Sequence, residues 1–407
     1  MKKKIGLITH HYACNFGANL QALSTVRYFQ KNGYEIYVID WHDSTLDDNF
    51  LKSVSLGQSH IHSDFVKKHF PLTRRCNNSK DITDVINDLK IDTIVIGSDA
   101  VVQHHPFLSR ISFPNRHIIG INHFTQDRLY PNQFWGDFLD GVDHPIGLAY
   151  MSVSCQNSPY QMIWGKTRKQ MKESVSKFNY ISVRDDWTKR MFDYILEKKT
   201  NIPITPDPVF SFNQNAGDLV PTIEEISSKF ELPEKYLLLC FFKNDFIGVE
   251  WFDEFIRIAE DEGYKCFSFP LPDGLYQHPK LKEINLPLSP LEWYAIIKNS
   301  SGFVGRNMHP IVISLHNAVP CFSFDQYGTK MFNLIPNEKS SKIYHILDKA
   351  GFRDNRVTNM GSYSKVTTPN EVLNRIMNFD IEKCLRFSKT QQREYNEMMS
   401  QICKLIK

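Results

Sequence analysis

The sequence predicts an α/β protein of two units in tandem, with a cleft between them and a closing helix at the C-terminus. Three observations support this prediction. The apolar pattern switches repeatedly between strand-type alternation and helix-type spacing. The rhythm breaks over residues 203–215, which hold three prolines and two asparagines, and then restarts. A length of 407 residues suits two domains of about 100–200 residues each.

The expected elements of the first unit alternate along the chain. They are strands over 5–9, 35–40, 93–96, 146–153 and 180–183, and helices over 17–32, 82–89 and 167–178. In the first helix, Leu20, Leu23 and Val26 recur at helical spacing, and Gly33 is a favourable C-terminal breaker. The two strands that flank this helix make a βαβ opening, which usually pairs in parallel with a right-handed crossover.

Residues 99–145 do not follow this rhythm. They are rich in His, Phe, Asn and Pro and show no sustained periodicity. Structureless loops longer than about 15 residues are uncommon in compact domains unless they have a function. We therefore expect a long functional insertion or lid here.

The second unit repeats the alternation. The expected elements are strands over 236–242, 264–270, 302–305 and 320–324, helices over 249–261, 290–299 and 309–317, and a final helix over 380–407. Ser289 and Pro290 suit the N-cap and first turn of their helix. We therefore divide the chain into residues 1–214, residues 215–380 and a C-terminal helix over 381–407. Open parallel sheets bind ligands beyond the carboxyl ends of their strands, so the cleft is the expected site.

Composition excludes several classes of protein. Hydrophobic residues make up 42% and charged residues 23%, as in ordinary globular domains, which excludes general disorder. A net charge of +3 is too balanced for a dedicated nucleic-acid binder. No apolar run reaches the ~18 residues of a membrane helix, and His10 ends the apolar start too early for a signal peptide. The eight cysteines are scattered without a C-x-x-C pair, which favours reduced thiols in a cytosolic protein over disulfides or a zinc site.

Candidate site residues follow the expected strands. The first strand leads into Asn15, Gly17 and Asn19 at a helix N-terminus, where free N–H groups favour an anion. Neither G-x-G-x-x-G nor G-K-S/T is present, so no dinucleotide or ATP phosphate loop is indicated. A tight turn at Gly17 and a helix cap at Asn15 explain this loop equally well. Ser98 and Asp99 end another strand, where Asp99 is either an N-cap or a proton acceptor.

Cations and a histidine follow three more strands. Arg184 precedes Asp185, which suggests either a surface ion pair or an arginine oriented toward an oxyanion. Arg306 and His309 come next, at an expected helix start whose dipole disfavours the protonated imidazole. A neutral His309 can exchange protons near neutral pH. Lys330 follows the next strand, and we expect Arg184, His309 and Lys330 to converge on one anion in the cleft.

Two further chemistries are not indicated. None of the histidine pairs has the helical spacing or the H-E-x-x-H motif of a metal site; these pairs are His10–His11, His60 with His62, and His104–His105. The G-x-S-x-G elbow of many α/β hydrolases is also missing from the sequence.

In order and spacing, four segments resemble the polysaccharide pyruvyl transferase family. They are the strand over 5–9 with N-F-G-A-N-L-Q-A-L at 15–23, V-I-G-S-D at 95–99, I-S-V-R-D at 181–185 with Asp-Pro at 207–208, and the stretches 289–293, 304–309 and 320–330. The family often has an arginine two residues before the histidine, where this chain has Asn307 and carries Arg306 one position earlier. Residues 100–103, Ala-Val-Val-Gln, replace the family's usual Gln and Trp-Asn.

This resemblance implies two Rossmann-like domains in a GT-B-like arrangement with an interdomain cleft. The N-terminal domain would hold the acceptor and the C-terminal domain the donor, phosphoenolpyruvate. The enolpyruvyl group would move to a sugar of a bacterial surface polysaccharide, or of its lipid-linked precursor, and form a cyclic pyruvate ketal. Such a reaction implies no metal, no redox cofactor and no nucleic-acid partner. It also implies a cytoplasmic protein, peripheral at the inner face of the membrane where the acceptor is lipid-linked.

The resemblance also suggests roles for the candidate residues. His309 and Asp99 would transfer protons, and Arg184, Arg306 and Lys330 would bind the phosphate and carboxylate of the donor. Contacts with the acceptor or the loop would come from Asn15, Gly17, Asn19 and Ser98. From the residues themselves, we expect 99–145, with His104, His105, Phe134 and Trp135, to line or cover the acceptor side, because aromatic faces suit the C–H surfaces of sugars. The competing interpretation is that these aromatic side chains fill the core. Two alternatives remain: a GT-B glycosyltransferase with a nucleotide-sugar donor, and a non-catalytic relative of such enzymes.

Overall fold

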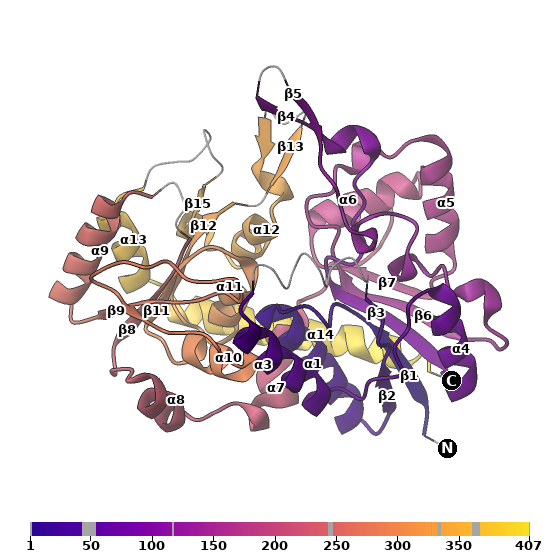
Figure 1. The fold of residues 1–407 in the computed structure, drawn as a ribbon, viewed down its shortest axis with the longest axis horizontal. Helices are drawn as coiled ribbons and strands as arrows, with labels where there is room; N and C mark the ends of the chain where they lie inside the picture. Colours follow the sequence, from indigo (N-terminus) through magenta and orange to yellow (C-terminus); the bar gives the residue numbers. More distant parts are fainter. Residues whose placement is uncertain are drawn as a thin grey trace.

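Two parallel sheets form the two halves of the molecule (Figure 1). The computed structural model describes residues 2–42, 54–115, 118–242, 247–326, 328–331, 335–359 and 367–406. Within these ranges, the side chains of 112–115, 118–119, 329–331 and 335–336 are not described.

The first sheet has the strand order β2-β1-β3-β6-β7, and all its pairings are parallel. Its strands are β1 (Lys4–Ile8), β2 (Glu35–Val38), β3 (Thr93–Asp99), β6 (Gly147–Val153) and β7 (Tyr180–Val183). The strand order reverses between β1 and β3, and ligands of open α/β sheets bind at such a switch point.

The second sheet has the order β10-β9-β8-β11-β12-β15 and is also parallel. Its strands are β8 (Tyr236–Cys240), β9 (Lys265–Ser268), β10 (Lys282–Glu283), β11 (Gly302–Gly305), β12 (Cys321–Asp325) and β15 (Arg356–Thr358). Its switch point lies between β8 and β11. Both halves are therefore Rossmann-like.

Helices flank the two sheets. They are α1 (Phe16–Lys31), α3 (Leu56–His69), α4 (Ser79–Leu89), α5 (Gly165–Ser176), α6 (Asp186–Ile195), α7 (Phe212–Ala216), α8 (Ile223–Phe230), α9 (Val249–Asp261), α10 (Pro290–Lys298), α11 (Met308–His316), α12 (Lys342–Lys349), α13 (Pro369–Met377) and α14 (Ile381–Cys403). The strands and helices expected from the sequence are present within a few residues of their expected bounds. As expected, Ser289 caps α10, with reciprocal hydrogen bonds between its side chain and backbone and those of Glu292. Helices α3, α6, α7, α8, α12 and α13 were not anticipated.

The two halves share a continuous apolar core. One cluster of buried side chains contains Leu7 and Leu23 from the first half and Phe303 and Ile311 from the second. Separate clusters fill the outer face of each sheet. This shared core fixes the two halves relative to each other, because its side chains cannot be separated without exposing apolar surface.

Two helices strengthen the junction between the halves. In α3, the buried Gln58 side chain makes two hydrogen bonds of 2.8 Å with the backbone N–H and C=O of Leu288. Helix α14 runs across both halves (Figure 1). Its Cys384 contacts Leu315 of α11, and the Met398 sulfur lies 3.3 Å from Ser152 Oγ in β6.

The expectation that aromatic side chains of 99–145 line the acceptor side was wrong for Phe134 and Trp135. Phe134 and Trp135 are 0% and 1% exposed and fill the core of the first half. His104 is buried and accepts a hydrogen bond from the Tyr130 N–H, and His105 stacks on Phe124. The competing interpretation, core filling, explains Phe134 and Trp135.

The segment also has structure of its own. It contains three-residue and four-residue 3-10 turns and the antiparallel pair β4 (Ile111–Asn115) and β5 (Ile118–Ile121). Among the residues that the structure describes, the segment reaches the cavity described below at its start, through Asp99, Ala100 and Gln103, and near its middle, through Asp127 and Arg128.

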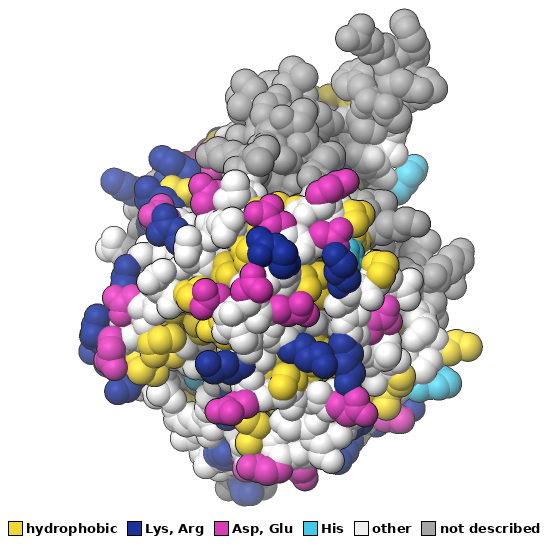
Figure 2. All heavy atoms as spheres, turned by 90° about the vertical axis from the view of Figure 1, so that its left-hand side faces the viewer, with side chains coloured by type: hydrophobic (Ala, Val, Ile, Leu, Met, Phe, Trp, Pro, Cys, Tyr) yellow, Lys and Arg dark blue, Asp and Glu magenta, His cyan; other side chains and the backbone are white. Residues whose placement is uncertain are grey.

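The outer face of the second half carries a mixed surface. Figure 2 shows basic and acidic side chains interspersed over this face. Within the described ranges, every helix is too short or too polar to cross a membrane.

Candidate active site

A cavity of about 620 Å³ lies between the two sheets. Its wall combines the loops after β1, β2 and β3 of the first half with the loops after β9 and β11 of the second, plus one side of α3. The carboxyl ends of both parallel sheets therefore face one space, as expected for ligand binding at switch points.

His309 packs directly against the start of α1. A Cβ atom added at Gly17 would lie 1.9 Å from His309 Cγ and 2.1 Å from Nδ1. Gly17 is therefore required by close approach, and no side chain fits between α1 and the imidazole. Asn15 caps the same helix, since its Oδ1 accepts a hydrogen bond from the Ala18 N–H at 3.1 Å. The helix-cap interpretation of Asn15 is thus confirmed, and both residues line the cavity.

His309 lies in the first turn of α11 and lines the cavity. Burial lowers its pKa below the ordinary value of 6.5, and the opposing fields of Asp99 and Asp207 do not reverse the shift. The imidazole is therefore neutral at neutral pH. The sequence predicted this state from the helix dipole, but burial is the main cause.

Asp99 lies at the centre of a buried charge cluster. Its Oδ1 is 2.9 Å from Arg184 Nη2 and 3.6 Å from Lys342 Nζ. Burial alone would raise the pKa of Asp99, but Lys342, Arg184 and His309 together hold it well below its ordinary value of 3.8. A carboxylate with so low a pKa is a weak proton acceptor, so the geometry favours a positioning role for Asp99 over proton transfer.

Arg184 is close to His309, as expected, but it does not face the cavity. Its guanidinium bridges two carboxylates, Asp99 at 2.9 Å and Asp207 at 2.7 Å, and its side chain is 3% exposed. Asp185 does not orient it; Asp185 caps α6 by accepting from the Thr188 N–H and binds Ser154 Oγ. The proposed direct contact between Arg184 and a donor anion therefore does not fit. The residue instead holds Asp99 in place.

Lys342, which was not among the residues expected from the sequence, supplies a cation at the cavity wall. It is the first residue of α12, its side chain is 9% exposed, and it lines the cavity. Burial lowers its pKa below 10.5, and Arg184 adds to the shift, whereas Asp99 opposes it. The only available signal was Ser341, a favourable N-cap whose hydroxyl accepts from two N–H groups of the next turn.

The two other expected donor cations have different outcomes. Arg306 does not line the cavity; its guanidinium lies over the Phe242 ring, 4.6 Å from the centroid. Lys330 has its backbone in β13 (Thr329–Met331), and its side chain lies outside the described part of the chain.

Asn19 and Ser98 are buried behind the wall of the cavity. The Asn19 amide donates to the His11 carbonyl at 2.8 Å and so fixes the loop after β1. The Ser98 carbonyl accepts a long hydrogen bond of 3.4 Å from Thr9 Oγ1. Both residues shape the loops, and neither is part of the cavity wall.

Three helix N-termini converge on the cavity. The residues that line it include Asn15 to Ala18 of α1, Asn307 to Pro310 of α11, and Lys342 of α12. Side chains cap α1 and α12, through Asn15 and Ser341, whereas α11 has no side-chain capping hydrogen bond. Helix N-termini and a lysine favour an anion such as phosphate or carboxylate.

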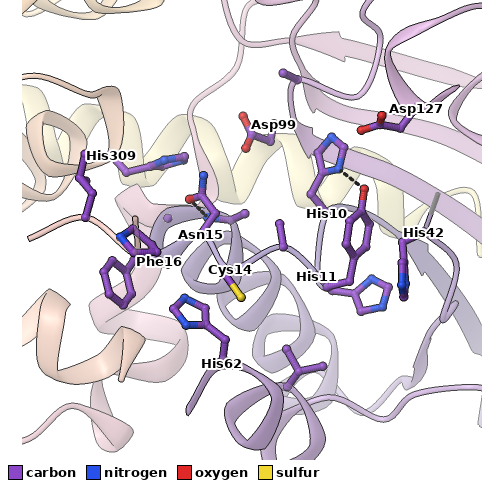
Figure 3. Close-up of a pocket in the computed structure, with 18 of the residues that line it drawn as sticks. His10, His11, Cys14, Asn15, Phe16, His42, His62, Asp99, Asp127 and His309 are labelled. Atoms are coloured by element: carbon purple, nitrogen blue, oxygen red, sulfur yellow. Dashed lines mark hydrogen bonds between the residues drawn. The ribbon is translucent and has the colours of Figure 1, made fainter. Parts of the chain in front are cut away.

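Two histidines of the first loop were not selected from the sequence. Figure 3 shows His10 between Asp99 and Asp127, and its Nδ1 lies 3.1 Å from the Tyr12 hydroxyl. Burial lowers the pKa of His10, and Asp127 and Asp99 oppose that shift. His11 is buried, with Nε2 3.1 Å from Asp40 Oδ1. Both are part of the cavity wall on the side of the first sheet.

In the part of the chain that the structure describes, the His, Cys, Asp and Glu side chains form no group of three that could hold a metal ion. The wall of the cavity combines four cations, Lys67, Arg75, Arg128 and Lys342, with four aspartates, Asp40, Asp99, Asp127 and Asp273. The cations suit the anionic groups of an organic ligand, and the carboxylates suit its hydroxyl groups.

Comparison with known proteins identifies the family and the fold. The sequence model of the family described as polysaccharide pyruvyl transferase matches residues 15–326. No curated protein matches the sequence significantly.

Solved structures are similar at low identity. A UDP-GlcNAc 2-epimerase from Methanocaldococcus jannaschii has a TM-score of 0.54 at 12% identity, over 98% of this chain and 100% of that chain. A further UDP-N-acetylglucosamine 2-epimerase has a TM-score of 0.51 at 10% identity, over 99% and 96%. A glycosyltransferase from Rickettsia africae ESF-5 has a TM-score of 0.50 at 9% identity, over 100% and 98%. At such identities the likeness shows the fold alone, which is the GT-B arrangement of two Rossmann-like domains.

The segment matched by the family model runs from the cap of α1 to the end of β12 and contains Asp99, Arg184 and His309. It covers most of the sequence and most strands of both sheets, leaving out β1 and β15. The chain therefore belongs to the polysaccharide pyruvyl transferase family.

Proposed function

We propose that this protein transfers the enolpyruvyl group of phosphoenolpyruvate to a saccharide and closes a cyclic pyruvate ketal. The family assignment supports a transferase with a pyruvyl donor and a saccharide acceptor. The observation that carries the finer proposal is the cavity in which Lys342 and three helix N-termini face a neutral His309. A small ligand that carries both a phosphate and a carboxylate, such as phosphoenolpyruvate, matches this set of groups.

In this proposal the donor lies at the His309 end of the cavity. Lys342 and the N–H groups at the start of α11 bind its phosphate and carboxylate. Asp99 holds the Lys342 ammonium at 3.6 Å, and Arg184 in turn holds Asp99. The acceptor occupies the rest of the cavity, between the loop after β1 and residues 127–128.

The chemistry requires movement of two protons. Protonation of the methylene carbon places positive charge on the carbon that carries the phosphate, and one sugar hydroxyl adds there. Phosphate then leaves with the help of the cation, and a second hydroxyl closes the ketal. In sum, one hydroxyl proton goes to the methylene carbon and one to phosphate. A neutral imidazole that takes up a proton and returns it suits this exchange, and His309 is placed for it.

The proposal is tested by phosphate release from phosphoenolpyruvate with a panel of p-nitrophenyl glycosides as acceptors. His309→Ala should reduce turnover at least about 10²-fold, in line with loss of a general acid or base, while the thermal unfolding temperature stays near that of the unaltered protein. Near-normal turnover in His309→Ala would remove the assigned role. Calorimetric titration with phosphoenolpyruvate and with UDP-sugars separates this function from a nucleotide-sugar glycosyltransferase, because only one of the two donors should bind.

A further inference from the structure

A projecting arm rises from the cavity wall. Gln103 and Asp127 line the cavity, and the chain between them includes β4 and β5, an antiparallel pair that belongs to neither main sheet. Figure 1 shows these strands at the top of the view, with β13 of the second half immediately below them in that view. We use the term arm base for Phe107, Leu108, Arg110 and Ile121, whose side chains are described.

The residues of the arm base lie together. Phe107 to Arg110 form one 3-10 turn that leads directly into β4. Ile121 pairs with Ile111 across the ladder, and the backbone N–H of the next residue donates to the Arg110 carbonyl at 2.8 Å. The Arg110 guanidinium lies 5.5 Å from the centroid of the Phe107 ring.

The arm base exposes apolar surface. Phe107 is 56% exposed, Leu108 49% and Ile121 48%. Exposed apolar side chains scattered singly need no explanation, but a group of them at the base of one hairpin indicates an interaction. Side chains of this size offer on the order of 100 Å² each at half exposure, well short of the ~800 Å² per partner of a stable protein interface.

Described cations lie beside this apolar group. Arg110 belongs to the arm base, and Arg128, which is exposed, lines the cavity immediately beyond the arm. The acid that follows the arm in the sequence, Asp127, is buried, with 4% of its surface exposed. Exposed apolar side chains beside cations match an anionic bilayer surface, where lipid headgroups attract the arginines and the apolar side chains enter the interface.

We propose that the arm base docks the protein on an anionic lipid bilayer. Both ends of the arm are part of the cavity wall, so docking places the mouth of the cavity next to the lipid surface. The benefit for catalysis rests on the proposed function: a saccharide that remains attached to a membrane lipid could then enter the cavity without leaving the bilayer. Vesicle binding itself does not depend on catalysis.

The test is co-sedimentation of the full chain with vesicles at millimolar lipid. Vesicles of phosphatidylcholine alone are compared with vesicles that contain about 30% phosphatidylglycerol. The protein should bind the anionic vesicles and lose binding as salt rises. Phe107→Ser with Leu108→Ser should lower the partition coefficient about tenfold or more, and Arg110→Gln about fivefold at low salt.

The matched control is Ile223→Ser with Val249→Ser, which removes two equally exposed apolar side chains (47% and 53%) from α8 and α9. This control should bind like the unaltered protein, and thermal melting verifies that every variant is folded. The proposal is overturned if the unaltered protein does not bind anionic vesicles, or if the arm-base variants bind these vesicles as well as the control does. A dimer in light scattering that the Phe107/Leu108 variant dissolves, without vesicle binding, would assign the arm base to a second copy of the chain instead. Phosphate release by the same variants with a water-soluble glycoside should be unchanged, which separates failure of docking from failure of the proposed activity.

Discussion

Gly17→Ala should disable the site while leaving the fold intact. Gly17 lies in the first turn of α1, in a helical conformation that alanine adopts without strain. Alanine favours helix over glycine by up to about 1 kcal/mol, so the backbone itself gains from the change. The new methyl group, however, would lie 1.9 Å from His309 Cγ and 2.5 Å from Cδ2.

The size of the effect follows from this overlap. Carbon atoms in contact are about 3.5–4.0 Å apart, so the imidazole must move by roughly 1.5–2 Å. A misplacement of about 1 Å in a catalytic group can cost on the order of 10² in rate. We therefore expect kcat to fall by roughly 10² or more. Overpacking costs typically 1–3 kcal/mol, which the helix propensity partly offsets, so the free energy of unfolding should change by about 2 kcal/mol or less.

Gly57→Ala is the matched control. Gly57 occupies the same position in the first turn of α3, but a Cβ atom there would lie 3.8 Å from the Pro287 ring, an ordinary contact. Phosphate release from phosphoenolpyruvate, denaturant unfolding and a structure of each variant decide the matter. If Gly17→Ala turns over like Gly57→Ala, or if its His309 ring has not moved, the reasoning about this contact is wrong.

Three further outcomes are expected. Lys342→Gln should weaken phosphoenolpyruvate binding about 10- to 100-fold in calorimetry, since a charge-assisted hydrogen bond is worth about 1.5–3 kcal/mol. Arg306 is outside the cavity wall, so the Arg306→Gln variant should bind phosphoenolpyruvate normally, and equal losses in both variants would contradict the assignment. Arg184→Met should lower the free energy of unfolding by about 3–5 kcal/mol, because it leaves two buried carboxylates without their shared cation. Urea unfolding measures this free energy. Arg190→Met, which breaks an exposed ion pair, should lower the free energy of unfolding by less than about 1 kcal/mol, and similar losses in the two variants would argue against a buried cluster. Burial lowers the pKa of His62 from 6.5 to about 4. As pH falls from 6.5 to 4, the unfolded chain binds a proton at this residue before the folded protein does, so the free energy of unfolding decreases over that window. His62→Asn should therefore reduce the fall in unfolding free energy over that window by up to about 1.4 kcal/mol per pH unit, and an unaltered slope would show that His62 is protonated in the folded protein.

The alternation of strands and helices could be predicted because its causes are local. Apolar runs such as 236–240, a breaker such as Gly33 and the cap at Ser289 act within a few residues of the element they define. The same locality explains why His309 could be placed at a helix start. Helix α12 was missed because the stretch before it has no apolar rhythm, and its one local signal, Ser341, is weak on its own.

The sequence by itself therefore determined the two α/β units, the cleft between them and the family-like motifs at its edge. Tertiary structure alone decided which side chains face the cavity. Arg184 turned away from the cavity toward Asp99 and Asp207, and Lys342 took its place at the wall. The physical reason is that a buried cation must find carboxylates that lie far away in sequence, and burial and pairing are settled only when both sheets and α14 have packed. Likewise, nothing near Gly17 in the sequence records that an imidazole from the other half of the chain will rest on its Cα.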